Sequence, residues 1–329
     1  AKGISWEQTT TGEQATIEPS TKATIACPER LPLSASQKHL WVLHQLYPNT
    51  SAYHISMVLN IKGIPSFSAL QQSLQSIVNR HESLRTVFLQ ENNQPYTKVL
   101  PRVELCFSVI DLTEAVEPAA EATRYCKKLA QTPFDLEFGP LLRSQLIKTE
   151  DNRFQLVLVL HHLIADGWSR GVLFQELATN YRNHIQGKAA QPLPELTAQY
   201  PDYVLQQQQW LKGEACQRQK AYWQQQLAEL PELTLPSDGI GGTDFVSMTC
   251  TQTFSIEQTQ AIKALAKNSG VTVFMLLLAI FKLLLHRYTC QRDIAVGVPV
   301  AGRNSSAIEP LIGFFVNTLV LRSQIAPQQ

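Results

Sequence analysis

The 329-residue sequence is 44% hydrophobic and 17% charged with a formal net charge of +1, so the length predicts about two domains and the near-neutral charge argues against nucleic-acid binding. Its longest apolar run, residues 273–281, ends at Lys282 and is too short to span a membrane. The six cysteines are scattered without a C-x-x-C pair, which predicts reduced thiols in a cytoplasm rather than a disulfide framework or a zinc site.

The first part of the chain predicts a polar tail followed by alternating helices and strands. Residues 1–29 are rich in Thr, Glu, Gln and Ser, which is typical of a linker or an N-terminal tail. Ser34 is the expected N-cap of a helix over residues 34–46, which carries an apolar stripe. The elements expected next are a strand at 57–61, a helix at 66–81, a strand at 103–111, a helix at 114–131 and a loop feeding a strand within 132–148.

A strand-to-helix junction near the middle of the chain carries the chemically informative residues. Residues 153–160 are almost all apolar or β-branched and predict a buried strand. His161 and His162 follow, and they point to opposite faces if the strand continues that far. Asp166 and Gly167 come next, and Asp166 is a suitable N-cap for the helix that the following pattern predicts. Catalytic groups and anion sites are commonly built at such junctions.

The second half of the chain predicts a linker at 187–195 and then mostly helices. The run around residues 206–209 is rich in glutamine, but the nearby aromatic residues favour an ordinary exposed helix. The other elements expected are a strand at 246–254, a helix at 255–268 capped by Ser255, a buried core helix at 272–288, a buried strand at 293–300 that ends in Ala301-Gly302-Arg303, and a strand within 312–322 after a glycine bend.

The string HHLIADGWS, residues 161–169, resembles the active-site motif of the CoA-dependent acyltransferase superfamily, and in its full form that of the condensation domains of non-ribosomal peptide synthetases. Four further strings resemble condensation-domain motifs in the family's order. They are LPLSASQKHLWVLHQLYPNTSAYH, RHESLRTVF, YPDYVLQQQQW and IGFFVNTLVLR. Together the matches span residues 31–322, and the family's later motifs are absent.

The resemblance implies an α/β (α+β) fold of two chloramphenicol acetyltransferase-like lobes in a V-shaped pseudo-dimer. The expected division is a tail at 1–29, an N-terminal lobe with the HHxxxDG motif at 30–200, and a partial C-terminal lobe at 201–329 that is truncated at its C-terminus. A tunnel between the lobes would hold the His motif. About half of the chain follows Gly167, so the same chain can supply the second wall.

The resemblance also implies a reaction and its partners. An acceptor amine on one peptidyl carrier protein would attack the donor thioester on another, which gives an amide. Both reactants would arrive on phosphopantetheine arms, so the domain itself would bind no cofactor and no metal. Neighbouring adenylation or polyketide synthase modules are the expected partners in a cytoplasmic multidomain enzyme, without nucleic acid or membrane.

By resemblance, His162 matches the catalytic position, either as a general base or as a group that positions the amine. His161 would be structural on the other strand face. Asp166 would pair with Arg303 and pin the motif loop to the second lobe, a role that is compatible with an N-cap.

The glycine turn completes the expected site. Gly167 lacks a Cβ, so a thioester can approach its backbone N–H, which would serve as an oxyanion donor. Trp168 and Ser169 would shape the turn as tunnel or oxyanion candidates. Arg80, His81 and Arg85 are expected to be structural residues near the site.

Two alternatives stay open. The same fold could use free CoA or an alcohol acceptor and form esters, or the chain could be an inactive domain that recruits partners. Within the condensation family, domains that join an L-configured donor and starter domains that add a fatty acyl group both fit these strings.

Overall fold

The computed structural model describes residues 30–186, 192–236 and 250–326, and the chain divides into two compact units. The first runs to Gln217 and also contains Ala301–Asn317, and the second contains Arg218–Val300 and the residues from Thr318 onward. The observed boundary after Gln217 therefore differs from the one expected at residue 200, and the segment 301–317 belongs to the first unit. The reason lies in packing, because Tyr200 is buried in a cluster with Leu311 and Phe315. The expected tail at 1–29 lies outside the described residues.

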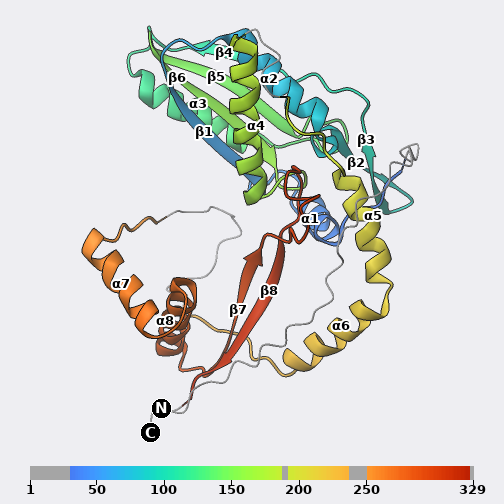
Figure 1. Cartoon of the computed structure of the whole chain (residues 1–329), viewed down its shortest axis with the longest axis vertical. Coiled ribbons are helices and arrows are strands. Elements are labelled where there is room, and N and C mark those ends of the chain that lie inside the picture. Colours follow the sequence, from blue (N-terminus) through green and yellow to red (C-terminus); the bar gives the residue numbers. More distant parts are fainter. Residues whose placement is uncertain (1–29, 187–191, 237–249, 327–329) are drawn as a thin grey trace. The chain divides into compact units, whose positions relative to one another are not determined.

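The first unit is built on a four-stranded mixed sheet in the order β1-β6-β5-β4 (Figure 1). Its strands are β1 (His54–Lys62), β4 (Phe107–Asp111), β5 (Leu142–Glu150) and β6 (Arg153–His161). β6 lies between β1 and β5 and is antiparallel to both, whereas β4 and β5 are parallel. Every residue of β6 from Leu156 to His161 is buried, which confirms the buried strand predicted at 153–160.

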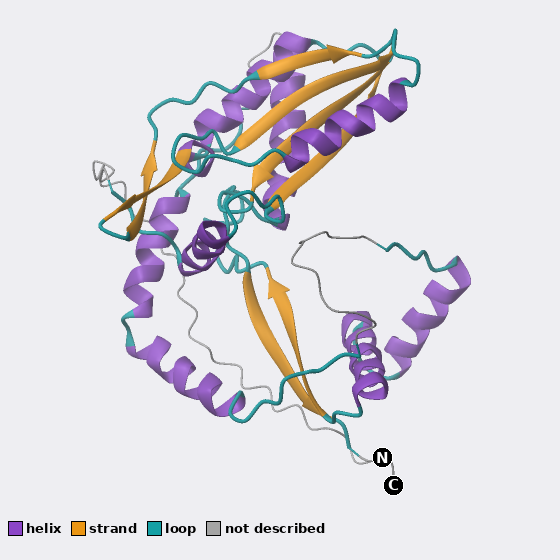
Figure 2. Ribbon diagram, turned by 180° about the vertical axis from the view of Figure 1, so that it is seen from behind, coloured by secondary structure: helices purple, strands orange, loops and turns teal. Residues whose placement is uncertain are grey.

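Helices cover both faces of this sheet. Figures 1 and 2 show α3 (Pro118–Gln131) on one face, and α2 (Phe67–Arg80) and α4 (Gly167–Gln186) side by side on the other. α1 (Ala35–Leu46) begins as predicted, since Ser34 Oγ accepts from the Gln37 N–H at 3.1 Å and the Gln37 side chain accepts from the Ser34 N–H. α3 starts at Pro118 rather than at residue 114, because proline suits the first helical turn.

A hairpin follows the second helix. The 3₁₀ turn η1 (Glu82–Arg85) leads into β2 (Thr86–Glu91), which pairs with β3 (Gln94–Val99). Asn92 and Asn93 connect them with φ angles of 50° and 60°, the left-handed geometry of a two-residue hairpin turn. The sequence patterns did not predict β3, because only one of its residues, Thr97, is buried and no apolar alternation marks it. The strand expected at 103–111 is shorter, beginning at Phe107.

The second unit contains α7 (Ile256–Asn268), α8 (Val273–Thr289) and the strand pair β7 (Asp293–Val300) and β8 (Asn317–Gln324), except that Asn317 is the last residue of the first unit. α5 (Tyr200–Leu211) belongs to the first unit, and α6 (Glu214–Gln226) crosses the unit boundary. Ser255 caps α7 as predicted. The strand expected at 246–254 is not found at 250–254, where the chain has no regular structure, and its first four residues lie outside the described residues.

Among the described residues of this chain, α8 is less buried than the core helix that its composition predicts. Only Lys282 and Leu285 are buried, while Phe274 and Ile280 are each about half exposed. α7 and β7 are its main packing partners and cover only part of its surface. β7 is likewise less buried than predicted, since Ile294 alone is fully enclosed. Among the described residues, no single helix meets both the length and the hydropathy needed to cross a membrane; α7 and α8 do so only as a pair bent by 98°.

Candidate active site

The two histidines of the motif stand where β6 ends. His161 is the last residue of β6 and is paired across the sheet with His54 on β1. His162 lies just beyond the strand, and its backbone N–H donates to the Tyr53 carbonyl at 2.8 Å. This hydrogen bond continues the pairing for one more residue and holds the backbone of His162 against β1.

His161 is fully buried among aromatic rings. The ring centroids of His44, His54 and Phe134 lie 5.6, 5.8 and 6.0 Å from its own. Its Nδ1 accepts the Leu163 N–H at 3.1 Å, so the hydrogen-bond pattern assigns the proton to Nε2 of a neutral ring. Burial, with smaller contributions from the nearby His44, His54 and His162, lowers the pKa of His161 to about 3. The neutral, enclosed ring fits the structural role expected for it.

His162 has a different environment. Its ring is partly exposed and lies edge-on to Phe314, with centroids 4.8 Å apart and planes inclined by 68°. Its Nδ1 is buried and finds no hydrogen-bond partner among the described residues. No described carboxylate orients this imidazole, so the site is not a carboxylate–histidine pair.

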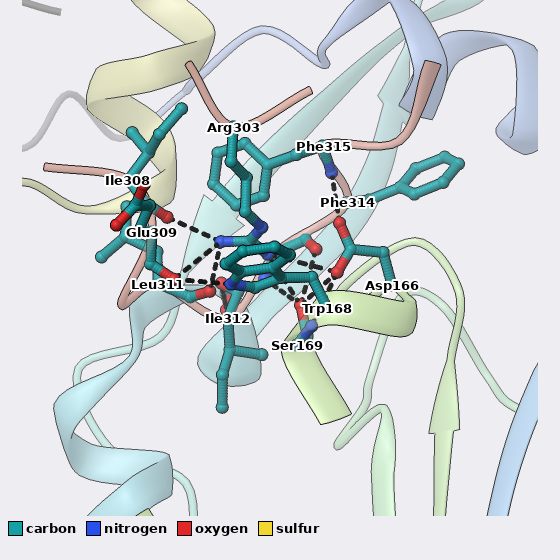
Figure 3. Close-up of polar contacts among 12 residues, drawn as sticks. Asp166, Trp168, Ser169, Arg303, Ile308, Glu309, Leu311, Ile312, Phe314 and Phe315 are labelled. Carbon is teal, nitrogen blue, oxygen red and sulfur yellow. Dashed lines mark hydrogen bonds and ion pairs between the residues drawn. The ribbon is translucent and has the colours of Figure 1, made fainter. Parts of the chain in front are cut away.

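Asp166 is the centre of a buried polar network (Figure 3). Its Oδ1 accepts from the Ser169 N–H at 2.8 Å and from Arg303 Nη2 at 3.2 Å, so both the expected N-cap and the expected ion pair are present. Its Oδ2 accepts the Phe315 N–H at 3.1 Å. These bonds direct the carboxylate toward α4 and the segment 301–317, and none is made to His162.

Arg303 connects this network to the loop of residues 308–311. Its Nη1 donates to the carbonyls of Ile308 at 2.6 Å and Leu311 at 2.7 Å, and its guanidinium carbon lies 4.1 Å from the centre of the Phe315 ring. Burial lowers the pKa of Arg303, and the charge of Asp166 opposes that effect. Arg303 belongs to the first unit, and the ion pair links the start of α4 to the segment 301–317. The expected anchor to a second lobe stays a prediction.

The hydroxyl of Ser169 is fully used within the protein. It donates to Asp166 Oδ1 at 2.7 Å, and it accepts from the Gly313 N–H and from Arg303 Nη2, both at 3.1 Å. A hydroxyl has one donor and two acceptor positions, so these contacts leave none for a substrate. Ser169 is also 1% exposed, and the expectation that it lines the tunnel or donates to an oxyanion is therefore wrong.

Gly167 and Trp168 remain accessible. Gly167 is the first residue of α4, and no atom lies within 4 Å of the position that a Cβ would take. Amide groups in the first turn of a helix have no partner within it and attract negative charge. Trp168 is 48% exposed and its Nε1 donates to the Glu309 carbonyl at 3.0 Å. Both residues line a cavity of about 680 Å³, together with Val172 and Pro310.

Side chains from several elements hold the residues just before β8, within the stretch 312–322 where the sequence predicted a strand after a glycine bend and matched a motif. Ser83 donates to the Ile312 carbonyl at 2.6 Å, and His81 Nδ1 accepts the Ile312 N–H at 3.3 Å. The Tyr200 hydroxyl donates to the Phe314 carbonyl at 2.8 Å. Burial raises the pKa of Tyr200, so the phenol keeps its proton. The string IGFFVNTLVLR was the available signal, but it did not show which side chains would bind it.

His81 also links this segment to the helices of the first unit. Its Nε2 lies 3.0 Å from a Glu176 oxygen, and Arg80 Nε donates to the other oxygen at 2.9 Å. His81 and Glu176 are 1% and 4% exposed. These buried contacts tie α2 to α4 and agree with the structural role expected for Arg80 and His81, while Arg85 donates to the Leu100 carbonyl at 2.5 Å.

Comparisons of this chain with family models, curated proteins and solved structures point to one family. A family model described as "Condensation domain" matches residues 28–329. A linear gramicidin synthase of Brevibacillus parabrevis is 40% identical over 301 residues, which cover 90% of this chain and 6% of the synthase. Malpinin synthetase of Mortierella alpina is 38% identical over 299 residues, which cover 90% of this chain and 4% of the synthetase. This chain therefore spans only a small part of either relative's length.

Solved structures share the fold. The first condensation domain of the calcium-dependent antibiotic synthetase, in complex with a substrate analogue, superposes with a TM-score of 0.78 at 26% identity and covers 91% of this chain and 71% of that one. A complex of the X-domain and OxyB from teicoplanin biosynthesis matches with a TM-score of 0.79 at 25% identity, covering 95% of this chain and 69% of that one.

Proposed function

Because this chain belongs to the condensation-domain family of non-ribosomal peptide synthetases, we propose that it forms an amide bond between an acceptor amine and a donor thioester. One observation supports this most directly: the motif offers one partly exposed imidazole, His162, followed five residues later by the open glycine N-terminus of α4. The adjacent His161 and Asp166 are committed to internal contacts, so His162 is the motif residue available for proton transfer.

The proposed reaction balances without an external oxidant or reductant. The amine nitrogen attacks the thioester carbonyl carbon, a C–N bond forms and the C–S bond breaks. His162 accepts the proton that the nitrogen loses, and that proton is returned to the departing thiolate, which leaves as a thiol. The N–H of Gly167 stabilises the negative charge that develops on the carbonyl oxygen.

Both reactants would be delivered on phosphopantetheine arms of carrier proteins, one upstream and one downstream in the synthetase. Tethering replaces an encounter in solution by a local one, and well-oriented reactants can gain about 7–11 kcal/mol in this way. The proposed chemistry then requires no cofactor held by this chain. Adenylation or polyketide synthase modules would load the carriers.

Replacing His162 tests this proposal in the synthetase module that contains the chain, with donor and acceptor loaded on carrier proteins. His162→Ala is expected to bind both carriers normally and to form amide about 10²–10⁴-fold more slowly, since a general base is lost. A much smaller loss would indicate that His162 positions the amine. Condensation at the parental rate would refute the catalytic assignment.

Two other functions make different predictions in the same assay. An ester-forming or free-CoA acyltransferase would turn over acceptors that are not bound to a carrier. A partner-recruiting domain would form no product with any acceptor, and the likeness to the X-domain solved in complex with OxyB is the observation that favours it. Product formed only from two carrier-bound substrates supports the condensation function.

A further inference from the structure

We infer that Phe314 is a positioning residue that holds the plane of the His162 imidazole. The inference rests on the proposed function, in which His162 transfers the proton. Its basis is the edge-on contact between the two rings, with centroids 4.8 Å apart and planes inclined by 68°. Aromatic rings favour this arrangement because the positive edge of one ring faces the negative face of the other.

The first supporting observation is that hydrogen bonds do not set the orientation of the imidazole. Histidines that take part in catalysis are commonly oriented by a bond to the second ring nitrogen. The Nδ1 of His162 is buried and makes no hydrogen bond to the described residues, and the Asp166 carboxylate is occupied by Ser169, Arg303 and Phe315. The position of this ring therefore depends on packing, and within the described part of the chain the aromatic ring that contacts it is Phe314.

The second supporting observation is that Phe314 stands on an immobilised backbone. Its own carbonyl accepts from Tyr200, and the flanking residues are bonded on both sides, Gly313 to Ser169 and Phe315 to Asp166. A side chain carried by such a backbone has little freedom to move, so it can act as a fixed wall for a second ring. Because Gly313 and Phe315 flank Phe314, the same hydrogen bonds connect the Asp166–Arg303 ion pair through Phe314 to His162.

The two adjacent phenylalanines have separate tasks. Figure 3 shows the Phe314 ring directed away from the Asp166–Arg303 network and the Phe315 ring beside Arg303. Phe315 is 2% exposed and packs on Tyr200, with ring centroids 5.0 Å apart. Phe315 thus belongs to the packing that supports the segment, and Phe314 is the residue that the segment presents to His162.

The test compares Phe314→Leu, which keeps an apolar side chain but removes the aromatic ring, with Phe314→Tyr, which keeps the ring. Phe138→Leu is the matched control, because Phe138 is 78% exposed. Each variant is made in the complete synthetase module, and amide formation from carrier-bound substrates is measured per folded molecule. NMR of labelled histidines in the same proteins reports the His162 ring protons, which sense the ring current of Phe314.

Phe314→Leu is expected to lower kcat by about 10- to 100-fold, the size of effect that a displacement of about 1 Å can cause. KM for the carriers should stay at the parental value, and Phe314→Tyr should restore most of kcat. The His162 resonances should shift in the leucine variant and stay near their parental positions in the tyrosine variant and in Phe138→Leu.

A parental kcat in Phe314→Leu, or unchanged His162 resonances, would overturn the inference. A lower yield of folded protein with unchanged kcat would also overturn it, because that is the result of a structural role alone. If the parent itself forms no amide, the proposed function fails, and the NMR comparison still decides whether the Phe314 ring lies against His162.

Discussion

His161 and His162 are neighbours in the chain, yet their side chains meet opposite conditions. His161 is enclosed by three aromatic rings and receives a backbone N–H on Nδ1, so its neutral form is strongly favoured. His162 is partly exposed and touches Phe314. The difference arises because β6 ends between them, which leaves one ring inside the core and the other at its margin.

Burial of His161 should make the protein less stable in acid. Its pKa is about 3 in the folded chain and 6.5 when exposed, so between these values the unfolded chain binds the extra proton. The free energy of unfolding therefore falls as the pH drops from about 6.5 toward 3. His161 is expected to contribute about 2 kcal/mol of this loss by pH 5. Burial also lowers the pKa values of His44 and His54, so these two residues act in the same direction.

Urea unfolding at pH 7 and pH 5 measures this effect. His161→Gln keeps an acceptor for the Leu163 N–H and removes the titration, so its stability should change less with pH than that of the parent. His39→Gln, which replaces an exposed histidine, serves as the control and should keep the parental dependence. An equal pH dependence in the parent and His161→Gln would contradict the prediction.

Removing the Asp166 carboxylate should destabilise the first unit. In Asp166→Ala, the buried Arg303 guanidinium loses its charged partner, and the Ser169 and Phe315 amides lose their acceptor. Breaking a buried ion pair costs about 3–5 kcal/mol, and chemical denaturation measures it. The control is Glu104→Ala, which breaks the Arg102–Glu104 pair whose side chains are 79% and 77% exposed. A variant at Asp166 that unfolds like the parent would eliminate the anchoring role.

At the level of elements, the segment between β7 and β8 supports the site although it has no regular secondary structure. Side chains from η1, α4 and α5 bind its backbone, and two glycines allow the close approach. A Cβ on Gly302, which has a φ of +65°, would lie 2.2 Å from the Phe315 carbonyl oxygen. A Cβ on Gly313 would lie 2.3 Å from the Tyr200 ring.

Gly313→Ala should therefore lower both stability and condensation rate. The added methyl overlaps the rings of Tyr200 and Phe315, and overpacking of this kind costs about 1–3 kcal/mol. Gly171→Ala is the matched control, because no atom lies within 4 Å of its Cβ position in α4, and alanine should stabilise that helix by about 0.5–1 kcal/mol. Thermal unfolding of both variants provides the comparison. If Gly313→Ala is as stable as the parent, Tyr200 is not packed as described.

At the level of the whole molecule, the first unit is discontinuous in sequence. The chain leaves it after Gln217 and returns with Ala301–Asn317, which supplies Arg303, Phe314 and Phe315. The site around His162 is thus complete only after the polypeptide has been synthesised as far as residue 317. This arrangement couples the folding of the first unit to the presence of a segment that begins only at residue 301.

A fragment that ends at residue 217 tests this coupling. It lacks the residues that pair with Asp166 and cover His162, so its midpoint of thermal unfolding should lie below that of the first unit in the full chain. A peptide of residues 301–317 added in trans should raise that midpoint, whereas the same peptide with Arg303→Ala should do so less. An unfolding midpoint equal to that of the full chain would show that the first unit is independent of the segment.

Local signals in the sequence determined the serine-capped helix starts, the central strand and the motif. Ser34 and Ser255 cap their helices as predicted because capping depends on residues two or three positions away. The apolar run before His161 forms a buried strand because its composition alone suits the interior of a sheet. The ion pair of Asp166 with Arg303 followed from the family resemblance, since the two lie 137 positions apart and no local pattern relates them.

Only the tertiary structure decided what each polar group contacts and which apolar surface is covered. The sequence predicted that Ser169 would be available to a substrate. In the structure, Arg303 and Gly313, more than a hundred residues away, donate to its hydroxyl and occupy both acceptor positions. α8 has the composition of a core helix, yet among the described residues of this chain only Lys282 and Leu285 of that helix are buried. The contact of Phe314 with His162 could not be predicted from the sequence either. Propensity and periodicity act over a few residues, whereas hydrogen-bond partners, burial and ring contacts depend on where distant segments meet in space.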